Sequence, residues 1–336
     1  MKHIIFGGDG FVGRYLAPRL LADGHEVVVA DIVKSDLPHY RDARFVPTDV
    51  TDPDSIRKLG IGADDMVYNL SAKMLSPIQV RAKRHDFFFP VNYYGTENII
   101  KAMDAAGAKS LVHFTTDMVY GHTYSWPQTE DHPCKPLGEY GLSKLKTEEV
   151  AADWRKRGMN ISLFRPRLII GPGRLGILAK LFKLIDNNLP VPMIGSGKNP
   201  YQFISVFDCA SAAHAAYKAG VPNEVYNLGS LNPPPVKKLL GDLVKHAGSK
   251  SILVPTPAWA VKRTLDFLDL INMPLMDPEQ YLIADEMCIL DVSKGERELG
   301  WVPQYRDEDM LIAAYSEYRK SVEGRLEPQA AASKAA

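Results

Sequence analysis

Residues 3–13, His3-Ile4-Ile5-Phe6-Gly7-Gly8-Asp9-Gly10-Phe11-Val12-Gly13, decide the fold of this chain. The apolar residues His3 to Phe6 predict a short buried strand, and Arg14 to Ala22 predict an amphipathic helix. Between them, Gly7 permits a tight turn, Gly10 lets the backbone approach phosphates, and Gly13 lets the helix lie close to the sheet. A strand, a glycine turn and a helix N-terminus are the parts that bind a dinucleotide pyrophosphate.

The glycine spacing does not identify the class of dinucleotide fold by itself. Gly8, Gly10 and Gly13 also satisfy the pattern G-x-G-x-x-G. A second predicted strand, Glu26 to Ala30, ends at Asp31, about 20 residues beyond the glycines. A carboxylate there can accept hydrogen bonds from the adenosine ribose and would repel a 2′-phosphate. The alternative is a solvated aspartate at a strand end, but glycines and acid together favour NAD over NADP.

Strands and helices alternate through the first half of the chain. The expected strands are 44–47, 66–70, 110–115 and 161–165, and the expected helices begin near Asp52 and span 90–106 and 137–156. This alternation predicts an α/β fold with a doubly wound parallel sheet and helices on both faces. The strand exits should line one crevice; they are Gly7, Asp31, Asp49, Ser71 and Thr115.

Proline and glycine punctuate the chain after about residue 170. We therefore expect a dinucleotide-binding domain over 1–170 and a smaller mixed α/β C-terminal substrate lobe over 171–322. Part of 201–230 should return to the sheet, notably Val225 to Leu228. An amphipathic helix over 258–271 is expected to pack on the lobe rather than on a membrane. The alanine-rich residues 323–336 predict a disordered tail.

Composition narrows the class of function. The 336 residues contain 40 Lys plus Arg and 40 Asp plus Glu, so the charges balance and nucleic-acid binding is not expected. The three cysteines lie far apart, which predicts neither disulfides nor a metal site and fits a reducing cytoplasm. No apolar run reaches membrane-spanning length, and no signal peptide is recognisable. A cytoplasmic enzyme is the expectation.

Tyr140 and Lys144 are the candidate catalytic pair. Four residues apart on a helix, they share one face. We expect the ammonium of Lys144, with the positive nicotinamide of NAD⁺, to lower the pKa of Tyr140 from its usual value near 10. Tyr140 could then take a proton from an alcohol as hydride leaves the same carbon. The alternative is an exposed helix face that carries this spacing by chance.

Thr116 follows the predicted strand 110–115, at the carboxyl edge of the sheet. Its hydroxyl could hydrogen-bond the reacting oxygen and steady a keto intermediate. The alternative is a β-branched residue that ends a strand. Next in sequence, Asp117 could face the substrate as an acid or cap the turn, and these two roles remain open.

The chain resembles the extended short-chain dehydrogenase/reductases, the NAD-dependent epimerase/dehydratase family. The matching motifs run almost end to end: Gly7-x-x-Gly10-x-x-Gly13, Asp31, Asp49-Val50, Asn92-x-x-Gly95-Thr96-x-Asn98, Thr116 to Gly121, Tyr140-x-x-x-Lys144, Arg165-Pro166, Tyr226-Asn227-Leu228-Gly229 and Leu299-Gly300-Trp301-x-Pro303.

The resemblance implies a Rossmann domain, a substrate lobe and a catalytic triad of Thr116, Tyr140 and Lys144. It also implies a homodimer through the helices 90–106 and 137–156. The implied NAD-binding residues are Gly7, Gly10, Phe11, Val12, Gly13, Asp31, Asp49, Val50, Leu70, Ser71, Ala72, Asn92, Tyr140 and Lys144. The candidate substrate contacts are Lys73, Asp117, Arg174 and Tyr201.

Three departures from the family pattern bear on the reaction. Phe6 stands where a threonine is usual, which costs one hydrogen bond. Met118 stands where dehydratases carry glutamate, and because Met is neither acid nor base, dehydration is disfavoured. Tyr201 stands where sugar-nucleotide members usually carry an arginine for the diphosphate. A later family arginine is also not obvious in 285–290; the candidate substitutes are Arg174, Lys180, Lys183 and Arg263.

A sugar-nucleotide epimerase that transiently oxidises a sugar hydroxyl is the leading hypothesis. The main alternative is a net dehydrogenase or reductase of a less polar alcohol, similar to 3β-hydroxysteroid dehydrogenases, which the neutral Tyr201 and the apolar residues Trp259, Phe267 and Met273 motivate. A sugar-nucleotide dehydratase or reductase is a further alternative. The intact triad argues against a regulatory protein that binds cofactor without catalysis.

Overall fold

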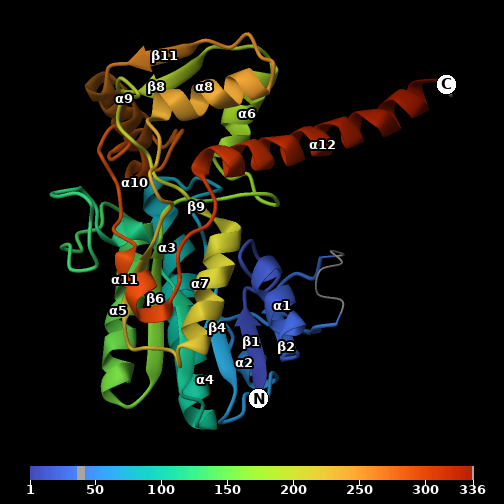
Figure 1. The fold of residues 1–336 in the computed structure, drawn as a ribbon, viewed down its shortest axis with the longest axis vertical. Coiled ribbons are helices and arrows are strands. Elements are labelled where there is room, and N and C mark those ends of the chain that lie inside the picture. The colour runs from blue at the N-terminus through green and yellow to red at the C-terminus, as the bar shows by residue number, and fades with distance from the viewer. Residues whose placement is uncertain (36–41, 335–336) are drawn as a thin grey trace.

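A seven-stranded parallel sheet forms the centre of the larger domain (Figure 1). The computed structural model describes residues 1–35 and 42–334. The order β3-β2-β1-β4-β5-β6-β10 places the first strand inside the sheet, between β2 and β4, as in doubly wound nucleotide-binding folds. The expected fold class is confirmed. The strands are β1 (Lys2–Phe6), β2 (Glu26–Asp31), β3 (Arg44–Pro47), β4 (Met66–Asn69), β5 (Ser110–Phe114), β6 (Asn160–Pro166) and β10 (Val225–Leu228).

Helices cover both faces of this sheet because alternate strand residues point to opposite sides. Ile5 belongs to the core beneath α1 (Gly13–Ala22) and α7 (Val206–Lys218). Ile4 and Phe6 belong to the core on the other face. The helices there are α2 (Pro53–Arg57), α4 (Gly95–Ala106) and α5 (Glu139–Lys156).

The larger domain also takes in segments from beyond residue 170. β10 adds to the sheet beside β6, as expected from sequence, and α7 packs on α1. The helix α11 (Ser293–Leu299) returns as well, and the indole of Trp301 donates a hydrogen bond to Ser211 Oγ at 3.0 Å. The packing of α11 on the larger domain was not predicted, because no sequence pattern indicates a contact between residues so far apart in the chain.

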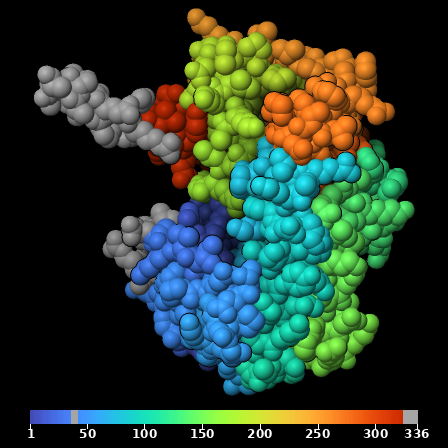
Figure 2. All heavy atoms as spheres, turned by 180° about the vertical axis from the view of Figure 1, so that it is seen from behind, coloured from blue at the N-terminus to red at the C-terminus, as the bar shows by residue number. Residues whose placement is uncertain are grey.

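The C-terminal lobe has its own apolar core. Its elements are β7 (Ile169–Ile170), α6 (Leu178–Asp186), β8 (Val191–Ile194), β9 (Ile204–Ser205), α8 (Val236–His246), β11 (Leu253–Thr256), α9 (Ala258–Leu270), α10 (Pro278–Tyr281) and α12 (Asp307–Lys334). The strands pair in parallel as β8–β11 and β7–β9. Seen from behind, the lobe (yellow-green and orange) sits on the sheet domain and meets its cyan segment (Figure 2).

The structure corrects one expected element. The stretch 90–106 is a π-helix, η3 (Pro90–Tyr94), followed by α4, and it continues α3 (Arg84–Phe89) rather than starting a helix. The helix α12 is Asp307–Lys334, and disorder of the residues 323–336 stays a prediction. Short 3₁₀ turns are η2 (Arg81–Lys83) and η4 (Asp117–Val119). Among the described helices, none is both long and apolar enough to cross a membrane.

Candidate active site

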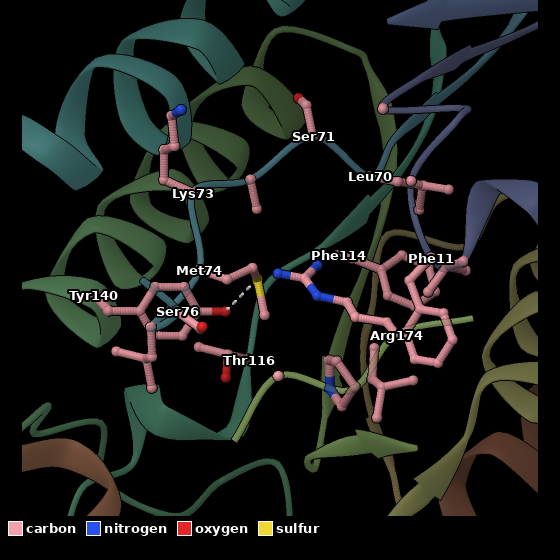
Figure 3. A pocket seen from close by; sticks show the side chains of 18 of the residues that line it. Phe11, Leu70, Ser71, Lys73, Met74, Ser76, Phe114, Thr116, Tyr140 and Arg174 are labelled. Atoms are coloured by element: carbon pink, nitrogen blue, oxygen red, sulfur yellow. Dashed lines mark hydrogen bonds between the residues drawn. The ribbon is translucent and has the colours of Figure 1, made fainter. Parts of the chain in front are cut away.

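A cavity of about 580 Å³ opens at the carboxyl ends of the sheet strands, between the sheet domain and the lobe (Figure 3). All five strand exits expected to line one crevice line this cavity: Gly7, Asp31, Asp49, Ser71 and Thr115. Because parallel strands end at the same edge, segments distant in sequence converge there.

The glycine turn at one end of the cavity excludes side chains by its geometry. Gly7 has φ +69°, and a Cβ there would lie 2.7 Å from Ser71 N. A Cβ on Gly10 would lie 2.8 Å from Gly7 O, and one on Gly13 would lie 2.4 Å from Gly8 O. Gly7 and Gly10 line the cavity, whereas Gly13 packs under the turn. The cradle therefore fits the diphosphate of NAD at the N-terminus of α1.

The adenosine end of the cradle is formed by Asp31, Asp49 and Val50, which all line the cavity. Asp31 ends β2, and its carboxylate accepts hydrogen bonds from Asp9 N at 3.0 Å and Ile32 N at 2.8 Å. Burial raises the pKa of Asp31, and these backbone bonds oppose the shift. A carboxylate oxygen has a further lone pair for a ribose hydroxyl. The remaining predicted cofactor contacts Phe11, Val12, Leu70, Ser71 and Ala72 line the same wall.

Asn92 does not line the cavity. It is fully buried in η3, where its amide oxygen accepts from Lys73 N at 2.8 Å and its amide nitrogen donates to Ser143 Oγ at 3.0 Å. Asn92 thus ties the loop after β4 to the helix α5. Asn92 was predicted to contact the cofactor. In the structure its side chain positions the loop that carries Lys73.

Tyr140 lies in the first turn of α5 with its ring buried beside the cavity. Its hydroxyl donates to Met74 Sδ at 3.5 Å (Figure 3). Burial raises the pKa of Tyr140, a hydrogen bond with Thr116 opposes this, and the charges of Glu279 and Asp117 add to it. The nearby positive charge that lowers the pKa is that of Arg174.

Lys144 lies on α5 four residues after Tyr140 and also lines the cavity. Its ammonium donates to Phe114 O at 3.0 Å, and burial lowers its pKa to about 7. Among the described protein groups, Arg174 is the cation that lowers the pKa of Tyr140, and the expected effect of Lys144 together with the nicotinamide of NAD⁺ stays a prediction. Within the described residues burial outweighs any cation, because both side chains are nearly inaccessible to water.

Asp117 lies beside a cation that the sequence analysis missed. The carboxylate of Asp117 pairs with Arg167, whose Nε also donates to Gln202 O at 3.2 Å. The Arg167 guanidinium lies 4.9 Å from the centre of the Tyr201 ring. Arg167 follows Arg165-Pro166 at the exit of β6, so its place at a strand exit was the signal available. Tyr201 therefore packs on Arg167, whose charge is neutralised by Asp117.

Arg174 lines the cavity, and its guanidinium makes no hydrogen bond or ion pair with the described residues. Its side chain extends between Phe11 and Met74, toward Tyr140 (Figure 3). Lys73 also lines the cavity, with its ammonium 5.5 Å from the Phe87 ring centre. The other candidate cations, Lys180, Lys183 and Arg263, are not among the lining residues.

Two further side chains at the site had no signal in the sequence. Met74 follows β4 in an irregular loop, where no spacing rule predicts that a thioether will meet Tyr140. Glu279 lies in α10, and its carboxylate accepts hydrogen bonds from the backbone of α5 across 139 residues of chain. Phe6 and Met118, the two other departures, lie respectively in the sheet core and on the cavity wall.

Known proteins resemble this chain in both sequence and fold. A model of the NAD dependent epimerase/dehydratase family matches residues 3–229. An uncharacterised protein of Sinorhizobium fredii is 29% identical over 94% of this chain and 78% of its own length. The UDP-glucose 4-epimerase of Lactobacillus helveticus is 25% identical over 96% of this chain and 98% of its own. The structure of Thermotoga maritima UDP-glucose 4-epimerase with UDP-glucose superposes with a TM-score of 0.77, at 23% identity, over 96% of this chain and 100% of that chain.

Proposed function

The chain belongs to the NAD-dependent epimerase/dehydratase family, and from that premise we propose that it is a sugar-nucleotide epimerase. The observation that carries the proposal is Arg174. It is a cation in the substrate half of the cavity, unpaired within the described residues and directed toward Tyr140. A diphosphate needs such a partner. Arg174 supplies it from a different position than the residue replaced by Tyr201.

The proposed reaction uses the three side chains around the reacting carbon. Tyr140 takes the proton of a sugar hydroxyl, and Thr116 holds the same oxygen through the ketone stage. Lys144 donates a hydrogen bond to Phe114 O and so holds the end of strand β5 at the base of the site. NAD, when bound, supplies a reversible hydride acceptor. Return of the hydride to the opposite face of the ketone carbon, and of the proton to its oxygen, gives the epimer with no net oxidation.

Epimerisation is favoured over dehydration by Met118. It lines the cavity directly after Asp117, where dehydration would need a carboxyl group, as a base to take the substrate proton or as an acid to protonate the departing hydroxyl. Asp117 is paired with Arg167, which keeps its carboxylate engaged. The arrangement thus offers groups for alcohol–ketone exchange without a second free acid beside Thr116.

A net dehydrogenase of a less polar alcohol is the second candidate. The cavity wall beside Arg174 is apolar, and this observation favours the alternative. The apolar residues are Met74, Leu75, Leu168, Leu175, Ile177 and Leu178.

Incubation with a panel of UDP- and dTDP-sugars, followed by NMR of the products, tests the proposal. We expect interconversion of epimers without stoichiometric NADH. Steady formation of NADH would contradict epimerisation and support the dehydrogenase.

Replacing Arg174 tests the observation itself. We expect Arg174→Met to raise the KM for the nucleotide sugar about tenfold, the loss of one charge-assisted hydrogen bond, with kcat little changed. Lys183→Met is the matched control, since Lys183 lies outside the cavity lining. An unchanged KM in Arg174→Met would remove Arg174 from its proposed role.

A further inference from the structure

The N-terminal turn of α5 is capped by a residue of the lobe rather than by its own sequence. The helix begins at Glu139, and Gly138 offers no side-chain cap. Glu279 Oε1 accepts from Tyr140 N at 2.9 Å and from Gly141 N at 3.1 Å, and Oε2 accepts from Gly141 N at 2.9 Å. The first N–H groups of a helix have no partner within the helix, so this carboxylate satisfies two of them.

Two glycines, Gly138 and Gly141, leave room for the Glu279 carboxylate. A Cβ on Gly138 would lie 2.6 Å from Glu279 Oε1, and a Cβ on Gly141 would lie 2.7 Å from Oε2. Neither glycine has a positive φ, so backbone conformation does not demand them. Close contacts demand them: Glu279 at Gly138, and at Gly141 both Glu279 and the backbone oxygen of Met118, which would lie 2.6 Å from a Cβ. The glycine next to Tyr140 therefore has part of its physical reason in a residue 138 positions away.

Glu279 is itself held in place by a chain of buried charges. Its backbone N donates to Asp277 Oδ1 at 3.1 Å. Asp277 lies 3.4 Å from Arg84 Nε, and Arg84 Nη1 donates to Asp269 at 3.0 Å. This network joins α3 in the sheet domain to α9 and α10 in the lobe, where the cyan and orange segments meet in Figure 2.

We propose that Glu279 is a positioning residue, which holds the first turn of α5, and with it Tyr140, from the C-terminal lobe. The inference rests on the proposed role of Tyr140 in proton transfer. The lobe would then do more than bind substrate, because it completes the catalytic helix. Displacing a reacting group by about 1 Å can cost about a hundredfold in rate, so the helix turn must be fixed.

The capping geometry tolerates either protonation state of Glu279. Burial and the charge of Asp277 raise the pKa of Glu279 to about 8, while the two backbone N–H groups and the helix terminus favour the ionised form. The other titratable groups facing it are Asp117 on η4 and Tyr140 on α5. In both states Oε1 keeps lone pairs for both N–H groups. A glutamine should therefore replace Glu279 far better than an alanine.

Hydrogen exchange of the full chain with NAD tests the contact without any sugar. In Glu279→Ala we expect amides of 138–145 to exchange about tenfold faster, the loss expected for a hydrogen bond to a charged group. Asp208→Ala is the matched control. Asp208 is also a buried carboxylate that accepts two backbone N–H groups, from Gln304 and Tyr305, but it lies away from α5. Unchanged exchange over 138–145 in Glu279→Ala would overturn the proposal.

Kinetics distinguish positioning from general stability. With a sugar that the wild type converts, Glu279→Ala should lower kcat at least about tenfold and leave KM within about twofold. Glu279→Gln should restore most of kcat, and Asp208→Ala should lower kcat little. Equal losses in Glu279→Ala and Glu279→Gln would overturn positioning by hydrogen bonding. If the wild type converts no sugar, the proposed function fails, and hydrogen exchange still decides the role of Glu279.

Discussion

Tyr140 is the side chain on which the proposed chemistry depends. Its ring is buried beside Thr116 and Met74, and its hydroxyl opens to the cavity lining. We expect Tyr140→Phe to lower kcat at least about a hundredfold, the usual contribution of a positioned acid or base, because phenylalanine keeps the ring but cannot take the proton of the substrate hydroxyl. NAD affinity, measured by calorimetry, should stay within about threefold of the wild-type value. Retained turnover would assign proton transfer to another group.

Asp31 is the residue that we propose selects NAD over NADP. Its carboxylate is fixed by Asp9 N and Ile32 N and faces the cavity. We expect Asp31→Ala to weaken NAD binding roughly tenfold through lost hydrogen bonds to the ribose, and to narrow the preference for NAD over NADP. Titration with both cofactors checks this. Unaltered preference would show that discrimination lies elsewhere.

The packing of helix α1 on the glycine turn requires a glycine at position 13, whereas not every helical glycine is required. A Cβ on Gly13 would meet Gly8 O at 2.4 Å, so the helix could not dock on the turn. Gly13→Ala should lower the free energy of unfolding by about 1–3 kcal/mol and abolish NAD binding. Gly241, inside α8, has only Leu253 Cδ1 near, at 4.0 Å. There, Gly241→Ala should stabilise by about 0.5–1 kcal/mol. Urea unfolding measures both, and changes of equal sign would contradict the packing argument.

The helices η3–α4 and α5 also support an interface prediction. We propose a homodimer through the surfaces of these helices that face away from the cavity. Tyr94, at the end of η3, is 51% exposed, which is high for a large aromatic side chain. Tyr94→Asp should shift the chain from dimer to monomer in light scattering, because an interface core excludes charge. Tyr124→Asp, at a 62% exposed tyrosine outside these helices, is the control. A wild-type monomer would refute the proposal.

At the scale of the whole molecule, acid stability reflects a buried histidine beneath the catalytic helix. His113 bonds Thr147 Oγ1 at 3.0 Å, and burial lowers its pKa to about 3. Because the pKa of His113 is lower in the folded state, its contribution to stability is complete above the unfolded-state pKa near 6.5. That contribution is lost as the pH falls from 6.5 toward 3.

We therefore expect the free energy of unfolding to fall by about 2 kcal/mol from pH 7 to pH 5 through His113 alone. In His113→Gln this part of the loss should vanish, whereas the exposed His246→Gln should keep it. Urea unfolding at the two pH values measures the difference. An identical slope in His113→Gln and wild type would assign the pH dependence to other groups.

The parallel sheet, the NAD cofactor and the family could all be predicted from sequence patterns. Local rules were sufficient there. Glycine spacing in 7–13, an acid at the end of β2 and strand–helix alternation each follow from contacts between residues near in sequence. The Tyr140–Lys144 spacing belongs to the same class, because one helical turn brings the two together. Parallel strands then bring all exits to one edge, so the crevice could be predicted without coordinates.

No sequence pattern predicted how the substrate side of the cavity is built. Asp117 pairs with Arg167, 50 positions away, and Glu279 caps α5 at Tyr140, 139 positions away. The direction of the Arg174 side chain likewise became visible only in the structure. Burial in the folded molecule also raises the pKa of Tyr140. Such contacts and the loss of water depend on how two domains pack, and no spacing along the chain encodes them. For this reason glycines 138 and 141, visible in the sequence from the start, acquired their meaning only in the folded molecule.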